Sequence, residues 1–151
     1  MKSYLDLAKK GLGKIALGGN AYSGSDFGFF IEPTILTDVP EDERVMKEIF
    51  GPVVAVNTFK TEKEVLAKAN GTEYGLFASV FTRDISRAMR FAKAIESGAV
   101  AISCSSPLWL PDMPSGGYKG SGLGREGYHH SLDQYLETKT VLLRVDEQIH
   151  G

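Results

Sequence analysis

This 151-residue sequence has a single cysteine and no large excess of charge of either sign. Cys104 is the single thiol, so no disulfide framework can form within the chain, and no spacing of cysteine and histidine matches a zinc site. Acidic and basic residues are interspersed and leave a formal net charge of -2, which argues against a nucleic-acid partner. This composition favours a reducing, cytoplasmic setting.

A long hydrophobic segment is missing as well. Met1 is followed by Lys2-Ser3-Tyr4 and not by the apolar run of a signal peptide, and no run elsewhere reaches the length that spans a bilayer. We therefore expect a soluble protein without a membrane partner. The length suits one ordinary domain and is too short for a nucleotide-binding domain plus a complete catalytic domain.

What the sequence does contain is an alternation of short apolar segments and amphipathic segments. Thr61 with Glu64 matches a helix capping box, and Asp84 is a helix cap in front of an apolar stripe. This alternation predicts an α/β fold with a parallel sheet and crossover helices, in which ligands bind beyond the carboxyl ends of the strands. The expected strands are 14–17, 29–36, 53–59, 76–81 and 99–102, and the expected helices are 4–10, a short one from Pro40, 61–70 and 84–97.

The stretch from Glu48 to Pro52 is the first candidate site. Gly51 permits an unusual backbone conformation and Pro52 ends any preceding helix, and the apolar strand 53–56 follows directly. A carboxylate and an aromatic ring, Glu48 and Phe50, are thereby held at the mouth of a strand, where they can line a ligand site. The alternative is that Glu48 is a solvated helix-end acid and Phe50 is part of the core.

The loop 103–115 is the second candidate site, because it follows a strand and holds three prolines together with the only tryptophan. Trp109, Leu110 and Met113 would need either a pocket or a partner surface to cover them, and both explanations remain open. Cys104 lies in the same loop. We interpret it as structural or incidental, since no base or cation that would stabilise a thiolate can be assigned to it.

The glycine pair and the glycine run suggest phosphate binding, but neither has the sequence pattern of a phosphate-binding loop. Gly18-Gly19 is not followed by the expected pattern, and Lys119 lies inside the run 116–126 and not after it. We interpret both segments as structural turns. His129 and His130 are adjacent on an expected helix and point in different directions, so they are interpreted as a surface pair and not as metal ligands.

Four blocks of sequence, in order, resemble the aldehyde dehydrogenase superfamily: 28–34, 48–52, 74–76 with 79–82, and 116–126. The resemblance implies the fold of the C-terminal half of that family's catalytic domain. It also implies that the family's nucleophilic cysteine, general-base glutamate and nucleotide-binding domain belong to sequence upstream of this chain. Once that portion is supplied, Glu48 would contact the nicotinamide ribose and Phe50 the nicotinamide region.

The match departs from the family at several positions. Ser115 stands where the family usually has an aromatic ring, Ser103 stands where asparagine is common, and 128–130 also differs. In the family the loop 103–115 helps to line the channel through which the aldehyde enters. Ser115 would therefore leave room for a bulkier or more polar ligand.

The segment 137–145 alternates polar and apolar residues as a strand does. In the family the matching strand joins an oligomerisation sheet, so an unpaired copy would recruit a neighbour and form a homodimer or a larger assembly. We divide the chain into a partial catalytic domain, 1–136, and a C-terminal oligomerisation strand with its tail, 137–151.

Three functions remain open, and we favour the first. It is a non-redox enzyme that cyclises, isomerises or condenses a carbonyl-bearing small molecule. The second is a fragment or split subunit of an NAD(P)-dependent aldehyde dehydrogenase, and the third is a non-catalytic interaction module. We expect no metal, and NAD(P) only when the missing domain is present. The candidate catalytic residues are Glu48, Asp112 and Ser115, and the candidate substrate-binding residues are Phe50, Trp109, Leu110 and Met113.

Overall fold

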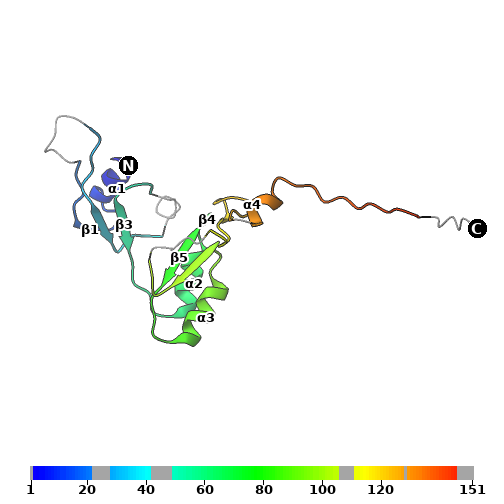
Figure 1. Ribbon diagram of the computed structural model, residues 1–151. Coiled ribbons are helices and arrows are strands. Elements are labelled where there is room, and N and C mark those ends of the chain that lie inside the picture. The colour runs from blue at the N-terminus through cyan, green and yellow to red at the C-terminus, as the bar shows by residue number, and fades with distance from the viewer. Residues whose placement is uncertain (1, 22–27, 42–48, 106–110, 128, 146–151) are drawn as a thin grey trace, which may run out of the picture.

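The computed structural model describes residues 2–21, 28–41, 49–105, 111–127 and 129–145. These residues form a first region (residues 2–57), a second region (residues 58–127), and a short helix from which an extended tail runs away from the rest of the molecule (Figure 1). No helix among the described residues is long and apolar enough to cross a membrane.

The first region contains a helix and a three-stranded sheet: α1 (Lys2–Lys9), β1 (Lys14–Leu17), β2 (Thr34–Thr37) and β3 (Val53–Val56). Strand β2 lies in the middle, antiparallel to β1 and parallel to β3. Because it has a neighbour on both edges, β2 is the best-buried strand, and its alternate residues Thr34 and Leu36 are only 2% exposed. Ala8 of α1 packs with Leu36 and Val39 to form the core of this region.

The second region is built around two helices and two separate strand pairs. Strands β5 and β6 are parallel, as predicted for a crossover connection through α3, whereas β4 and β7 are antiparallel. None of these strands is hydrogen-bonded to the sheet of the first region. The elements are α2 (Glu62–Asn70), β4 (Tyr74–Gly75), β5 (Phe77–Val80), α3 (Ile85–Ala94), β6 (Ala99–Ile102) and β7 (Tyr118–Lys119), followed by α4 (His129–Asp133).

Both predicted helix caps are confirmed. The Thr61 hydroxyl accepts a hydrogen bond from the Glu64 amide (3.1 Å), and the Glu64 carboxylate accepts one from the Lys60 amide (2.8 Å), so the capping box reaches one residue further than expected. Asp84 accepts hydrogen bonds from the amides of Ser86 (2.8 Å) and Arg87. Each carboxylate or hydroxyl satisfies amides that have no partner inside the helix.

Two of the predicted strands are shorter than expected. The strand predicted for 29–36 begins only at Thr34, because Pro33 has no N–H for the ladder. The strand predicted for 53–59 ends at Val56, where the Asn57 side chain takes over the pairing. Its Oδ1 accepts from the Val39 amide (2.9 Å) and its Nδ2 donates to the Val39 carbonyl (2.8 Å).

Two other predicted elements are not confirmed. The segment 137–145 pairs with no strand in the described part of the chain. Most of the helix predicted from Pro40 lies outside the described residues.

The chain exposes far more surface than a complete domain of its size. Its accessible surface is 12097 Å², whereas a folded monomer of 16.4 kDa exposes about 7,500 Å². Large apolar side chains account for part of the excess: Phe29, Phe50, Leu76, Leu123 and Leu142 are all at least half exposed. Soluble monomers rarely leave so much apolar surface in water, so these faces are suited to contact further polypeptide.

Candidate functional site

The stretch Ile49 to Pro52 lies at the amino-terminal end of β3 and is held there by β2. The Thr34 amide donates to the Pro52 carbonyl (2.8 Å), and the Val53 amide donates to the Gly51 carbonyl (2.8 Å). This turn leaves the Phe50 ring 92% exposed, so the expectation that Phe50 is a core residue does not hold for this chain alone. Glu48, the other residue predicted for this site, lies outside the described residues.

The glycine pair Gly18-Gly19 supports this turn from the other side of β2. The Gly19 amide donates to the buried Thr34 hydroxyl (2.9 Å), which in turn donates to the Glu32 carbonyl (2.9 Å). Gly18 has φ +69, and a Cβ there would overlap the Pro33 carbonyl. The pair is therefore a structural turn, as predicted, and its amide serves a hydroxyl and not a phosphate.

A cavity of about 620 Å³ lies between the end of α2, the strands β4 and β5, and the glycine run. The Phe50 ring forms part of its wall, and apolar side chains dominate the remainder, Tyr74, Leu76, Phe77 and Ile95 among them. Its size falls within the range of small-molecule sites. Ser97 also lines it, and its Oγ is buried without a hydrogen-bond partner among the described residues.

The wall formed by the glycine run is fixed by Lys119, whose backbone has the positive φ of +53. Its ammonium contacts the carbonyl oxygens of Asn70 (2.7 Å) and Thr72 (3.3 Å) and the carboxylate of Glu96 (2.6 Å). Three donors are thus matched by three acceptors. This lysine has no donor left for a phosphate, which agrees with the predicted structural turn.

A second cavity of about 240 Å³ holds Ser115 and shares Leu76 and Ser121 with the larger one. Ser115 is half-buried, and its backbone pairs with Glu126 in both directions (2.8 and 2.7 Å). The predicted residues Phe50 and Ser115 therefore line neighbouring cavities that meet at a common wall.

The other predicted site residues are not gathered at these cavities. Asp112 and Met113 are exposed and line neither cavity. Trp109 and Leu110 lie outside the described residues. The Cys104 thiol is exposed, and among the described residues no group of three acidic, histidine or cysteine side chains could hold a metal ion.

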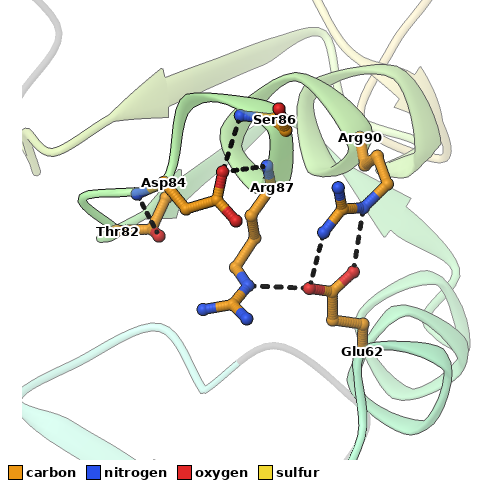
Figure 2. Close-up of polar contacts among 6 residues, drawn as sticks. All are labelled: Glu62, Thr82, Asp84, Ser86, Arg87 and Arg90. Atoms are coloured by element: carbon orange, nitrogen blue, oxygen red, sulfur yellow. Dashed lines mark hydrogen bonds and ion pairs between the residues drawn. The ribbon is translucent and has the colours of Figure 1, made fainter.

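One polar cluster was missed by the sequence reasoning. Glu62 accepts hydrogen bonds from Arg87 Nε (2.7 Å) and from Arg90 Nε and Nη2 (3.1 and 2.9 Å), which ties the start of α2 to α3 (Figure 2). Arg90, and next Arg87, lower the pKa of the Glu62 carboxyl to about 2. The spacing of the two arginines on one helix face was the available signal, but nothing in the sequence indicated the partner 25 residues earlier.

Comparison with known proteins supplies the context of these cavities. The model of the "Aldehyde dehydrogenase family" matches residues 1–141. Retinaldehyde dehydrogenase 3 of Rattus norvegicus is 42% identical over 145 residues, and the chloroplastic betaine aldehyde dehydrogenase of Atriplex hortensis is 41% identical over 149 residues. These matches cover 95% and 98% of this chain but only 28% and 30% of the relatives, so the chain spans less than a third of their length.

Solved structures give the same picture. An apo betaine aldehyde dehydrogenase variant from Staphylococcus aureus superposes with a TM-score of 0.88 at 39% identity, covering 99% of this chain and 30% of the other. An aldehyde dehydrogenase from Mycobacterium tuberculosis, complexed with NAD+, superposes with a TM-score of 0.87 at 34% identity, covering 98% and 30%. The fold predicted from the resemblance is therefore confirmed.

Proposed function

Because this chain belongs to the aldehyde dehydrogenase family, we propose that it supplies the carboxyl-terminal part of the catalytic unit of an NAD(P)-dependent aldehyde dehydrogenase. It works in that role only together with the remaining part, and it oxidises no aldehyde without it. The comparisons favour this role over the non-redox enzyme that the sequence had suggested, because the chain matches dehydrogenases over nearly its whole length.

The proposal is supported by the combination of a dehydrogenase-like backbone with large exposed apolar surfaces. The chain follows its structural relatives at a TM-score of 0.88 over 30% of their length, and it leaves 12097 Å² accessible. A ring such as Phe50 is held at the head of a strand by a defined turn and yet is almost wholly exposed. Such an arrangement is expected where a second body completes the site.

The cofactor role proposed for this chain is a partial one. Phe50 offers one flat apolar face beside a cavity, which fits the nicotinamide end of a dinucleotide, and Glu48 is the proposed contact to the adjacent ribose. Bound NAD(P)+ would supply the acceptor for hydride. Phe50 would orient the nicotinamide ring by contact and exclude water from its face, while the hydrogen bond between Thr34 and Pro52 keeps the turn in place.

The substrate role falls to the loop 103–115. Ser115 is proposed to contact the aldehyde, and Trp109, Leu110 and Met113 of the same loop are proposed to bind it. The smaller cavity at Ser115 shares a wall with the larger cavity at Phe50, so substrate and nicotinamide can approach each other there. A hydroxyl in place of a ring favours a bulkier or more polar aldehyde.

Phe50→Ala tests the cofactor role in a completed enzyme. A chimaera joins the part of the Staphylococcus aureus enzyme that precedes the matched region to residues 2–151 of this chain. We expect NADH formation from an aldehyde by the chimaera and none by this chain alone. Phe50→Ala should raise the KM for NAD+ about fivefold, since one stacking face is worth about 1 kcal/mol. Phe29→Ala, which removes another fully exposed ring that lines neither cavity, is the matched control.

NAD+-dependent oxidation by the purified chain, with no other polypeptide present, would contradict the proposal. An active chimaera in which Phe50→Ala and Phe29→Ala behave alike would contradict the role of Phe50 alone.

A non-redox role remains the second candidate, because the cavity of about 620 Å³ is formed by this chain without a nucleotide-binding domain. It would bind a carbonyl-bearing molecule and act by confinement and by acid or base assistance from Glu48, or from Ser115 in the adjoining cavity; Asp112 was also predicted for this role but lines neither cavity. Mass spectrometry of small molecules that copurify with the chain tests it. A retained carbonyl compound favours this role, and an empty cavity favours the dehydrogenase role.

Self-association is proposed for the tail. Residues 137–145 are extended, and Val141, Leu142, Leu143 and Val145 are each more than 70% exposed. An extended segment with exposed apolar side chains recruits another strand. Light scattering at micromolar concentration should give a dimer or a larger species, and a monomer would contradict the assignment.

A further inference from the structure

The Lys119 side chain joins three segments that are far apart in the sequence. Lys119 itself belongs to β7 in the glycine run. Its ammonium contacts the carbonyl oxygens of Asn70 (2.7 Å) and Thr72 (3.3 Å) at the end of α2, and the carboxylate of Glu96 (2.6 Å) between α3 and β6. The side chain is only 28% exposed, so solvent weakens these contacts less than it weakens a fully exposed ion pair.

Each of the three joined segments supplies part of the wall of the cavity of about 620 Å³. The wall residues from these segments are Ala69, Thr72, Ile95, Glu96, Gly120 and Ser121. Lys119 is not among the residues that line the cavity. It therefore acts on the cavity only through the segments that it joins.

Backbone groups of these segments also approach one another closely. A Cβ on Gly75 of β4 would overlap the Glu96 carbonyl and would come within 3.0 Å of the Tyr118 Cβ. A Cβ on Gly98 would overlap the Gly116 carbonyl in the same way. Such close packing leaves little free space, so a displacement of one segment is passed on to its neighbours.

Ser121 places this wall between the two cavities. It lines both the cavity beside Phe50 and the smaller cavity that holds Ser115. Its hydroxyl accepts a hydrogen bond from the Gly75 amide (2.9 Å), and it follows Lys119 by two residues. A shift of this wall would therefore change the separation of the two cavities.

We propose that Lys119 is a positioning residue for the proposed reaction: its ammonium holds the shared wall at Ser121 and thereby sets the separation of the nicotinamide site and the aldehyde site. The inference rests on the proposed function and adds to it a residue that touches neither reactant. Both reactants still bind when the contacts of Lys119 are lost, but their alignment is poorer. The loss therefore falls on kcat and not on either KM.

Lys119→Met tests this role in the chimaera defined above, because methionine keeps most of the length of the side chain but has neither charge nor donor. We expect kcat to fall about tenfold, with the KM for NAD+ and the KM for the aldehyde within about twofold of their original values. The deuterium isotope effect on kcat, measured with an aldehyde deuterated at its carbonyl carbon, should rise because C–H cleavage becomes the slow step. Lys14→Met is the matched control, since it removes another ion-paired lysine, held to Asp38 (3.0 Å) in the first region, and should change none of these quantities.

Glu96→Gln tests the charged partner of Lys119. Glutamine keeps an acceptor oxygen but no charge, so kcat should fall less than it does in Lys119→Met. Added to Lys119→Met, the change should have little further effect, because the contact has already gone. A raised KM with an unchanged kcat, or equal effects of Lys119→Met and Lys14→Met, would overturn the positioning role.

Hydrogen exchange in this chain alone separates the inference from the proposed function. In Lys119→Met one amide from each joined segment should exchange faster, namely those of Gly71, Glu96 and Gly120, while the amides of β2 keep their rates. Faster exchange confined to Gly120 would overturn the joining of the three segments. An inactive chimaera together with faster exchange in all three segments contradicts the proposed function and supports the joined wall.

Discussion

The two regions of this molecule are held together by different forces. The first region (residues 2–57) has an apolar core in which Leu5, Ala8, Leu36 and Val39 are all less than 5% exposed. In the second region (residues 58–127) only Ala88 and Phe91 of α3 are buried among the described helices and strands, and every residue of β6 is only partly covered.

Polar clusters hold the second region where apolar packing is thin. Glu62 joins α2 to α3 through two arginines (Figure 2). Lys119 joins the glycine run to the end of α2 and to Glu96. Hydrogen bonds and ion pairs fix geometry but add little net stability when they are exposed. The second region is therefore ordered but leaves much of its apolar surface exposed. Such a surface suits a part of a catalytic unit that packs against further polypeptide.

Leu36→Ala should have the largest effect, because Leu36 belongs to the buried apolar core of the first region. Deleting most of a side chain that is 2% exposed should lower the free energy of unfolding by about 2–5 kcal/mol in urea denaturation. Leu123→Ala is the control, since its side chain is 99% exposed and should change stability by less than about 0.5 kcal/mol. Comparable losses in the two variants would erase the contrast between the regions.

Lys119→Met should have a smaller effect, confined to the second region. Loss of the ammonium leaves the carbonyls of Asn70 and Thr72 without this donor, so the unfolding free energy should fall by about 1 kcal/mol. Hydrogen exchange should show faster exchange of the Gly120 amide, which donates to the Glu73 carbonyl, and no change in β2. Faster exchange in both regions would mean that the molecule opens as one unit.

Acid titration tests the clamp at Glu62. The pKa of its carboxyl is about 2 in the folded chain, below its ordinary value of 4.5, so its stabilising contribution is complete above pH 4.5 and is lost as the pH falls toward 2. Glu62→Gln should therefore flatten this part of the curve of unfolding free energy against pH. Adding Glu62→Gln to Arg90→Gln should flatten it by less than Glu62→Gln does alone, because one partner has already gone. Additive effects would show that the two groups act independently.

Cys104→Ala should have the smallest effect. The thiol is exposed, so its removal should change neither the denaturation midpoint nor the activity of the chimaera. Activity lost from a variant that still folds would identify Cys104 as a reacting group.

Local sequence signals predicted the parts of this structure that depend on neighbouring residues. The caps at Thr61 and Asp84 follow from side chains that satisfy amides two or three residues away, and the turn at Gly18-Gly19 follows from the conformational freedom of glycine. The parallel pairing of β5 and β6 was also predictable, because the connection between them is a helix. These features need no knowledge of the rest of the chain.

Contacts between distant residues could not be predicted in the same way. Lys119 and Asn70 lie 49 residues apart, and nothing local to either of them indicates the other. The site was predicted only in part for the same reason: Phe50 and Ser115 line adjoining cavities, whereas Asp112 and Met113 are exposed and line neither. The strand predicted for 137–145 depends on a neighbour that the described part of the chain does not offer.

Asn57 shows how a carboxamide can imitate a peptide group. Its side chain meets both backbone groups of Val39, so it prolongs the ladder between β2 and β3 by one rung after β3 itself has ended. The ion pair of Glu41 with Lys68 fastens the next few residues to α2 (2.8 Å). Residues 39–41 are therefore held by Asn57 of the first region and by Lys68 of the second region. Asn57→Leu keeps the bulk of the side chain but removes both hydrogen bonds to Val39, so it should loosen this segment.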